Sequence, residues 1–317
     1  MNSVFGAEST TDQVLSGIDL HGKRILVTGA SAGIGVETAR ALVARGAEVV
    51  GAVRDLDKGE RATTAVRAAT AQGGAFSLVA LDLASLASIR ACTEMLVEKA
   101  QAFDVIIGNA GVMACPQGHT ADGFETQFGT NHLGHFVLVN RLAALLKPGA
   151  RVVCLSSGGH RFADVDLQDP NFTRGDYQPF VAYGRSKTAN ILFAVGLDKR
   201  LQSRGVRATA VHPGVIQTEL GRHLTPELRA QIMPAGGAAP AFVFKTVPQG
   251  AATSVWSACT AAADAVGGRY CEDCHVAELT DDPAARGGVR AYALDAAHAD
   301  ALWTKSEEMV GEQFRYA

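Results

Sequence analysis

The chain has 317 residues, of which 47% are hydrophobic and 19% are charged, and its formal net charge is −3. This composition supports a sizeable core and gives no electrostatic reason to expect a nucleic-acid or anionic-membrane partner. No apolar run reaches the roughly 18 residues of a transmembrane helix, and residues 1–19 lack the regions of a secretory signal, so we expect no membrane anchor.

Short β-branched runs alternate with longer helical patterns along the chain. The predicted strands cover residues 24–28, 48–53, 76–81, 105–108, 151–155 and 208–212. The predicted helices lie near 34–45, 58–71, 85–101, 122–146, 180–203 and 249–263. This alternation predicts an α/β fold with a single doubly wound parallel sheet between two layers of helices, of the Rossmann type. We expect one domain over residues 1–317, in which residues 1–20 form an N-terminal extension.

A glycine-rich turn joins the first predicted strand to the first predicted helix. Its glycines are Gly29, Gly33 and Gly35, in a Gly-x3-Gly-x-Gly spacing. Such a turn lets the backbone approach a pyrophosphate, and the helix N-terminus offers free N–H groups. The usual dinucleotide fingerprint has a different spacing, so a plain glycine-rich turn is the alternative.

The second predicted strand ends at Arg54 and Asp55. An arginine here can pair with the 2′-phosphate of NADP, whereas an acidic residue favours the free ribose hydroxyl of NAD. Arg54, with Lys58 one turn further on, favours NADP, and Asp55 keeps NAD possible. The alternative is a surface arginine without a ligand.

Tyr183 and Lys187 lie four residues apart in a predicted helix, so their side chains share one face. Removing a proton from an alcohol near neutral pH needs a base of matching pKa, and free tyrosine has a pKa near 10. A neighbouring ammonium and the positive charge of an oxidised nicotinamide both favour the phenolate, so we expect a lowered pKa for Tyr183. A tyrosine and a lysine four residues apart are common by chance, so this pair indicates a catalytic site only together with the other motifs of the sequence.

Further polar and small residues follow or lie between the predicted strands. Ser157 ends the fifth strand and could orient a substrate carbonyl, with Ser156 as a one-residue alternative. The run Asn109-Ala110-Gly111 would let a cofactor pass close to the backbone. Asn131 lies within an apolar predicted helix, where an unsatisfied amide is unfavourable, so we expect a kink or a proton-relay role.

With these motifs in order, the sequence resembles the short-chain dehydrogenases/reductases from about residue 20 to residue 275. It is most similar to the branch that includes the retinol dehydrogenases and the oxidoreductase domain of WW-domain-containing oxidoreductases. The glycine-rich turn and residues 54–59, 131–136 and 183–190 carry the resemblance. It implies an NAD(P)-dependent oxidoreductase that assembles as a dimer or tetramer through the helices near 122–146 and 180–203.

The resemblance also implies a role for each matched residue. Ser157 would polarise the carbonyl, Tyr183 would exchange the proton, and Lys187 would also bind the nicotinamide ribose. Asn131 would connect a water chain to that lysine. The implied cofactor contacts are Gly29, Ser31, Ala32, Gly33, Ile34, Gly35, Arg54, Asp82, Leu83, Asn109, Ala110, Gly111, Tyr183, Lys187, Pro213, Gly214, Val215, Ile216 and Thr218. Two departures are Gly108, where the family usually has asparagine, and a long insertion between Ser157 and Tyr183 that the retinol dehydrogenase branch shares.

A substrate lid is expected over residues 219–247, again from the resemblance. Its wall would consist of apolar residues in and near that segment, namely Leu220, Leu224, Met233, Phe242, Phe244, Met113 and Phe162. These residues could instead pack against the core or a partner chain. None carries a charge, so we expect a hydrophobic alcohol, ketone or aldehyde as substrate. Retinoid-like, steroid-like and aromatic compounds all remain open.

The cysteines and histidines show no metal-site spacing. The six cysteines are scattered, which favours free thiols and a cytoplasmic location. Residues 271–275 hold two cysteines and a histidine but lack a second ligand pair, so we interpret them as a turn after the last strand and expect no metal. His132 and His135 are interpreted as core or helix-face residues, and His119 and His160 as loop residues near the cleft mouth.

Three functions compete at this point. A carbonyl reductase or alcohol dehydrogenase with Tyr183 as proton donor and acceptor is favoured. Reduction of a carbon–carbon double bond would use the same tyrosine and lysine. A non-catalytic nicotinamide-binding scaffold is less favoured, because both Tyr183 and Lys187 are present.

Overall fold

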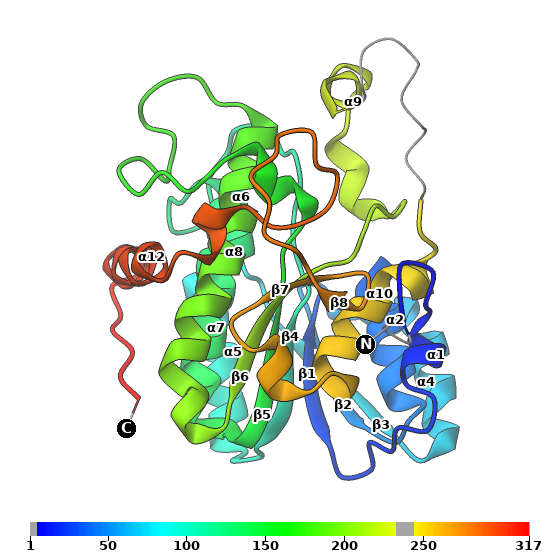
Figure 1. The fold of residues 1–317 in the computed structure, drawn as a ribbon. Helices are drawn as coiled ribbons and strands as arrows, with labels where there is room; N and C mark the ends of the chain where they lie inside the picture. The colour runs from blue at the N-terminus through cyan, green and yellow to red at the C-terminus, as the bar shows by residue number, and fades with distance from the viewer. Residues whose placement is uncertain (1–4, 233–243, 317) are drawn as a thin grey trace.

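The structure, a computed structural model, describes residues 5–232 and 244–316, and one eight-stranded sheet lies at its centre (Figure 1). The sheet order is β3-β2-β1-β4-β5-β6-β7-β8, with β1 to β7 parallel and β8 antiparallel to β7. The strands are β1 (Arg24–Thr28), β2 (Glu48–Val53), β3 (Ala75–Ala80), β4 (Phe103–Gly108), β5 (Leu146–Leu155), β6 (Arg207–His212), β7 (Tyr270–Glu272) and β8 (His275–Val276). The strand order reverses at β1 and β4, so ligands are expected at the carboxyl ends of these two strands.

Helices cover both faces of this sheet and make three layers (Figure 1). One face carries α1 (Thr11–Val14), α2 (Gly33–Val43), α4 (Thr64–Ala69) and α10 (Val247–Val255). The other carries α5 (Leu86–Glu98), α7 (Gly134–Leu142), α8 (Pro179–Leu201) and α12 (Ala296–Val310). The shorter helices are α3 (Leu56–Ala62), α6 (Thr126–Phe128), α9 (Pro226–Ile232) and α11 (Ala263–Val266). The predicted three-layer fold is confirmed.

Several tighter or wider helical turns complete the architecture. The 3-10 segments are η1 (Thr70–Gln72), η3 (Ala143–Leu145), η4 (Gly158–Phe162), η5 (Gln202–Arg204), η6 (Glu219–His223) and η8 (Ala291–Leu294). The π-helical segments are η2 (Gly129–Leu133) and η7 (Trp256–Thr260). Within the described part of the chain, no helix is long and apolar enough to cross a membrane.

The central strand β1 shows how the core fixes the sheet. All five of its residues are buried. Leu26 packs into the apolar cluster beneath α7 and α8, whereas Ile25 and Val27 pack into the cluster beneath α2 and α10. A strand covered on both faces reads as a continuous apolar run, as the sequence suggested. This packing holds the carboxyl end of β1, and with it Thr28 and the glycine-rich turn, in place.

One predicted feature needs correction. Residues 271–275 do not follow the last strand: Cys271 lies in β7, His275 lies in β8, and the turn falls between them. Strands this short carry too few β-branched residues to be recognised from a sequence pattern. The described part of the N-terminal extension packs on the core, because Val14 and Leu15 are fully buried in the cluster beneath α2 and α10.

Candidate active site

The glycine-rich turn adopts the backbone conformation that its glycines permit. Gly29 and Gly33 have φ values of 71° and 49°, in the left-handed region that favours glycine. A Cβ on Gly35 would lie 2.2 Å from the carbonyl oxygen of Gly29, so only glycine allows α2 to begin this close to the turn. Ala32, at the N-cap of α2, offers no side chain to cap the first N–H groups. These free donors suit a pyrophosphate.

The segment after β4 lies against this turn. The Asn109 side chain donates from Nδ2 to the Thr28 carbonyl at 2.8 Å, and the Ala110 N–H donates to the Thr28 hydroxyl at 2.9 Å. A Cβ on Gly29 would stand 2.9 Å from Cα of Ala110. The predicted Asn109-Ala110-Gly111 run is therefore brought to the glycine turn at the switch point of the sheet.

The segment after β6 closes the other side of the turn. A Cβ on Gly33 would lie 3.1 Å from Cγ2 of Thr218, and Ile34 and Ile216 both approach the same spot on Gly250. Gly214, in the same segment, has a φ of 89°. The predicted segment from Pro213 to Thr218 therefore packs along the glycine turn. Within it, the Val215 side chain remains 39% exposed.

The residues after β3 have local roles as well. Asp82 accepts the N–H of Ala84 at 2.9 Å, and its own N–H donates to the Ser88 hydroxyl at 2.9 Å. Leu83 is buried, and its carbonyl oxygen would lie 2.5 Å from a Cβ on Gly134. Both residues lie at the carboxyl edge of the sheet, where an adenine contact was predicted.

Three charged residues follow β2, and the structure gives them different surroundings. Arg54 is exposed and forms no ion pair or side-chain hydrogen bond with any residue that the structure describes. Asp55 accepts the N–H of Lys58 at 2.9 Å and thereby caps α3. The Lys58 ammonium donates to Glu219 at 2.7 Å instead of standing free beside Arg54. Only Arg54 is therefore available to a phosphate without breaking a contact.

Asn131, for which a kink or a proton-relay role was predicted, lies in the π-helical segment η2. Its Oδ1 accepts the Val112 N–H at 2.8 Å, and its Nδ2 donates to the Val112 carbonyl and to the Ser186 hydroxyl, both at 2.9 Å. The amide is therefore fully satisfied and ties η2 to α8 and to the segment after β4. A Cβ on Gly111 would stand 3.1 Å from Asn131 Oδ1 and 3.4 Å from Lys187 Nζ, which places both side chains near one point.

Tyr183, Lys187 and Ser157 come together at the carboxyl end of β5. Tyr183 and Lys187 are each 4% exposed, and the ammonium lies 5.7 Å from the centre of the tyrosine ring. Gly159 links Ser157 to Tyr183, because its N–H donates to the Ser157 hydroxyl at 3.0 Å and a Cβ on it would stand 2.7 Å from Cε1 of the Tyr183 ring. Ser156 is the wrong alternative, because its hydroxyl donates to the Lys187 carbonyl at 2.8 Å and is buried. The predicted cluster of serine, tyrosine and lysine therefore exists as a single group.

The expected acidification of the phenol is not found in the protein itself. Burial raises the pKa of Tyr183 to about 12, although the hydrogen bond from Ser157 acts in the opposite direction. Burial also lowers the pKa of Lys187 to about 8. The ammonium donates to the Leu155 carbonyl at 3.1 Å and does not reach the phenol oxygen, so its charge does not offset the desolvation of Tyr183.

The histidines are more deeply engaged than predicted. His160 is fully buried in η4, so it is not a residue of the cleft mouth. His135 donates from Nδ1 to the Asn131 carbonyl at 2.9 Å, while its Nε2 lies 2.9 Å from the Thr28 hydroxyl. His212 and Gly159 were part of motifs after predicted strands but were given no role, and the structure places His212 against Gly158 and Gly159 against Tyr183. Their signal was position: one directly precedes Pro213 and the other follows Ser157 by two residues.

The segment that was predicted to form a substrate lid is described in part. Residues 219–232 include η6 and α9, above the carboxyl edge of the sheet (Figure 1). Of the residues predicted to form its apolar wall, Phe162 and Phe244 are 47% and 50% exposed, and Met113, Leu220 and Leu224 are half-buried. The predicted wall residues Met233 and Phe242 lie outside the described residues.

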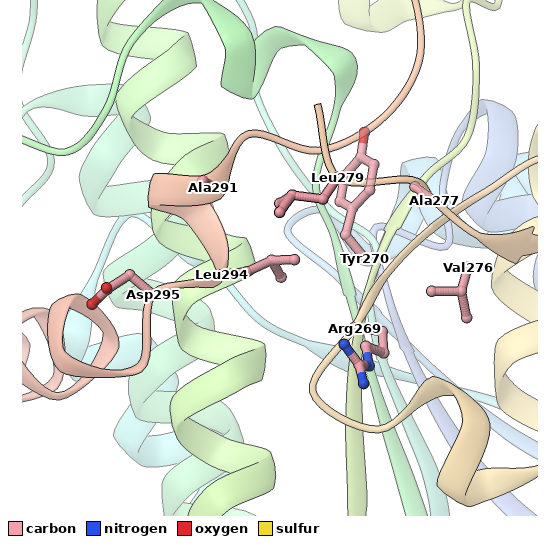
Figure 2. Close-up of a pocket in the computed structure, with 8 residues that line it drawn as sticks. All are labelled: Arg269, Tyr270, Val276, Ala277, Leu279, Ala291, Leu294 and Asp295. Atoms are coloured by element: carbon pink, nitrogen blue, oxygen red, sulfur yellow. The ribbon is translucent and has the colours of Figure 1, made fainter. Parts of the chain in front are cut away.

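A separate pocket of about 430 Å³ lies between the β7–β8 hairpin and η8 (Figure 2). Its lining consists of Arg269, Tyr270, Val276, Ala277, Leu279, Ala291, Leu294 and Asp295. None of these is a predicted site residue. The pocket is therefore not the place where Tyr183 would act.

Comparisons with known proteins agree with this geometry. Residues 23–229 match the model of the short chain dehydrogenase family. The chain is 40% identical over 303 residues to retinol dehydrogenase 14 of Mus musculus, a match that covers 92% of this chain and 87% of that protein. It also resembles the crystal structure of an uncharacterised protein from Mycobacterium paratuberculosis, with a TM-score of 0.73, 32% identity, and coverage of 98% and 100%. A short chain dehydrogenase from Burkholderia cenocepacia in complex with NADP gives a TM-score of 0.63 at 25% identity, covering 81% of this chain and 98% of that one.

Proposed function

This chain belongs to the short-chain dehydrogenase family and is an NAD(P)-dependent oxidoreductase similar to the retinol dehydrogenases, and on this premise we propose that it reduces a hydrophobic ketone or aldehyde with Tyr183 as the proton donor. The observation that carries the proposal is the placement of Ser157 and the Lys187 ammonium beside the buried Tyr183, with Gly159 in contact with both the serine hydroxyl and the tyrosine ring. The group lies at the carboxyl edge of the sheet, on the same edge as the glycine turn.

The protonated phenol is the form of Tyr183 that carbonyl reduction requires. A tyrosine whose pKa is about 12 is neutral at physiological pH and can donate its proton to the oxygen of a carbonyl. Ser157 would hold that oxygen by a hydrogen bond, and NADPH, when bound, supplies the hydride to the carbonyl carbon. The product is an alcohol, and Tyr183 regains its proton from solvent. In the oxidation direction, the same phenol must first lose its proton.

The charged residues after β2 support NADP over NAD. Arg54 is exposed and unpartnered among the described residues, so its guanidinium can bind a 2′-phosphate with little rearrangement. Asp55 already accepts the N–H of Lys58 as the cap of α3. A contact of Asp55 with the free ribose hydroxyl of NAD would compete with that cap.

The proposed substrate is hydrophobic. The aromatic rings of Phe162 and Phe244 are about half exposed, and the Val215 side chain is exposed as well. The related proteins of mouse and human are named retinol dehydrogenases, so a retinoid-like aldehyde is the first class to test. Product analysis by mass and NMR separates carbonyl reduction from reduction of a carbon–carbon double bond.

Self-association as a dimer or tetramer is a further proposal, and the structure restricts where it could occur. The helices near 122–146 and 180–203, through which the resemblance implied self-association, are partly covered by α12 of the same chain. Phe136 of α7 packs edge to face on Trp303 of α12 with ring centres 5.0 Å apart, and His132 Nε2 lies 2.8 Å from the Ser306 hydroxyl. A homo-oligomer would therefore use a surface that α12 leaves open, and sedimentation velocity of the wild-type chain tests whether one forms.

The compartment is proposed from the cysteines. All six cysteines are free, and five of them are buried. Free thiols are typical of a reducing compartment, so we propose a cytoplasmic location, which fractionation of expressing cells would test.

The decisive assay follows NADPH absorbance with a panel of retinoid, steroid and aromatic aldehydes and ketones. Turnover of at least one member that is lost in Tyr183→Phe supports the proposal. Tight NADPH binding without turnover of any member would instead support the scaffold function.

A further inference from the structure

Two histidines hold the turn that carries Ser157 from opposite sides. His212 ends β6, and its Nδ1 accepts the N–H of Gly158 at 3.1 Å and the N–H of Gly214 at 3.4 Å. His160 lies in η4, where its Nδ1 donates to the Ser157 carbonyl at 2.8 Å. The two imidazoles therefore hold the single peptide group that joins Ser157 to Gly158, one at its carbonyl oxygen and the other at its N–H.

The hydrogen bonds define the tautomer of each ring. Backbone N–H groups only donate, so Nδ1 of His212 carries no proton and the neutral ring is protonated on Nε2. A carbonyl oxygen only accepts, so His160 is protonated on Nδ1, and its Nε2 accepts the Arg290 N–H at 3.3 Å. Both rings must be neutral for these contacts to exist together.

His212 joins two segments that would hold different reactants. Gly158 directly follows Ser157, the proposed partner of the substrate carbonyl, whereas Gly214 belongs to the segment proposed to contact the nicotinamide. One acceptor atom therefore sets the spacing between the group that holds the carbonyl and the group that holds the hydride donor. Ser157 has no other direct link of this kind to the segment after β6 among the hydrogen bonds of the described residues.

The packing leaves this turn little room to relax. A Cβ on Gly158 would stand 2.9 Å from Nη2 of Arg161 and 3.3 Å from Nε2 of His212. Arg161 is itself anchored, because its guanidinium donates to the Arg286 carbonyl at 2.6 Å. The Ser157 hydroxyl, finally, accepts the Gly159 N–H at 3.0 Å. A change at His212 therefore moves the Ser157 turn as a unit.

We propose that His212 is a positioning residue for catalysis, which sets Ser157 against the nicotinamide segment through the paired N–H groups of Gly158 and Gly214, with His160 as the second brace. The proposal rests on the proposed function, because it takes Ser157 as the group that holds the carbonyl. His212 touches neither substrate nor cofactor in this scheme and acts only through the backbone.

Two substitutions of equal size isolate the acceptor atom. In His212→Asn, Oδ1 stands two bonds beyond Cβ, as Nδ1 does in histidine, so the acceptor is kept. In His212→Leu, a methyl group takes that place. We expect His212→Leu to lower kcat by about 10- to 100-fold, because a misplacement of about 1 Å can cost that much, while the NADPH Kd changes by less than about 3-fold. His212→Asn should retain kcat within about 3-fold of wild type on the same argument.

Controls separate positioning from folding. His298→Leu removes a histidine of α12 whose ring lies 3.5 Å from Asp164, away from the turn, and should leave kcat unchanged. Circular dichroism and the free energy of unfolding show whether each variant is folded. If folded His212→Leu keeps wild-type kcat, or if His212→Asn is as slow as His212→Leu, the proposal is overturned.

A readout without turnover keeps this test independent of the proposed function. Long-range ¹⁵N–¹H NMR of the histidine rings in the wild-type chain should show His212 protonated on Nε2 and His160 on Nδ1. The opposite tautomer at His212 would rule out the hydrogen bonds of its Nδ1 with the N–H groups of Gly158 and Gly214, whatever the activity, and would overturn the proposal. Correct tautomers in a chain that binds NADPH but reduces no carbonyl would instead overturn the proposed function and leave the brace standing.

Discussion

The backbone of Gly159 lies directly against the ring of Tyr183. A Cβ on this glycine would stand 2.7 Å from Cε1 and 2.9 Å from Cδ1 of the ring, which are closer than such carbon atoms pack. The N–H of the same glycine donates to the Ser157 hydroxyl at 3.0 Å. One residue without a side chain therefore touches both of the hydroxyl-bearing side chains of the candidate site.

The substitution Gly159→Ala tests this contact. The added methyl must push the Tyr183 ring away, so we expect kcat to fall by about 10- to 100-fold with an NADPH Kd close to wild type. Steady-state kinetics and NADPH fluorescence titration measure the two quantities. Gly6→Ala is the matched control, because a Cβ there meets nothing within 4 Å. Unchanged kcat in folded Gly159→Ala would show that the ring position does not matter.

Cofactor preference is expected to depend on Arg54. Because a hydrogen-bonded charge pair contributes roughly 1.5–3 kcal/mol, Arg54→Ala should weaken NADPH binding by about 10- to 100-fold and leave NADH binding almost unchanged. Arg61→Ala removes another exposed arginine from α3 and serves as the control. Equal losses for both cofactors, or for both variants, would remove the basis for NADP preference.

The pH dependence should differ between the two reaction directions. Because the pKa of Tyr183 is about 12, reduction needs no deprotonation and should be flat from about pH 6 to 8, whereas oxidation should rise with pH. Ser157→Ala removes the hydrogen bond that lowers the pKa of Tyr183, so any residual oxidation should rise at a higher pH than in wild type. A rise at lower pH in Ser157→Ala would contradict the assigned contact.

Lys187 should also make the free energy of unfolding depend on pH. Burial lowers its pKa to about 8 in the folded chain, while an unfolded lysine has a pKa near 10.4. Between these values the unfolded state binds more protons, so the contribution of Lys187 to the free energy of unfolding rises with pH. Denaturant titrations should therefore show that the free energy of unfolding of wild type increases relative to that of Lys187→Met from pH 8 to 10. A constant difference between the two proteins would mean that Lys187 is not buried.

Local spacing was sufficient to predict much of the fold and the site. The βαβ alternation and the continuous apolar runs predicted the parallel sheet, because strands covered on both faces have no polar alternation. Tyr183 and Lys187 were predicted to share a face because their separation is one helical turn. Asn131 was recognised because an amide in an apolar helix must find partners, and it does so in the π-helical segment.

The remaining features depend on contacts between distant segments. His212 and Gly158 are 54 residues apart, and His160 and Arg290 are 130 apart, so no local pattern indicates either of these two contacts. The pKa of Tyr183 is raised in the protein alone because desolvation depends on burial from every side, which spacing along one helix does not report. The predicted lowering also included the charge of a bound oxidised nicotinamide. The sequence could not show that Arg54 but not Lys58 is free to bind a phosphate, because the ion pair of Lys58 with Glu219 joins distant segments.

The central claim is that the Tyr183 hydroxyl donates the proton to a substrate carbonyl, and Tyr183→Phe tests it most directly. The measurement is the single-turnover rate of NADPH oxidation with a carbonyl substrate that wild type reduces, together with the NADPH Kd of each protein. We expect the variant to bind NADPH within about 3-fold of wild type and to lose at least about 10²-fold in rate, the scale of general acid catalysis. A variant that binds NADPH and still reduces the substrate at the wild-type rate would contradict the account.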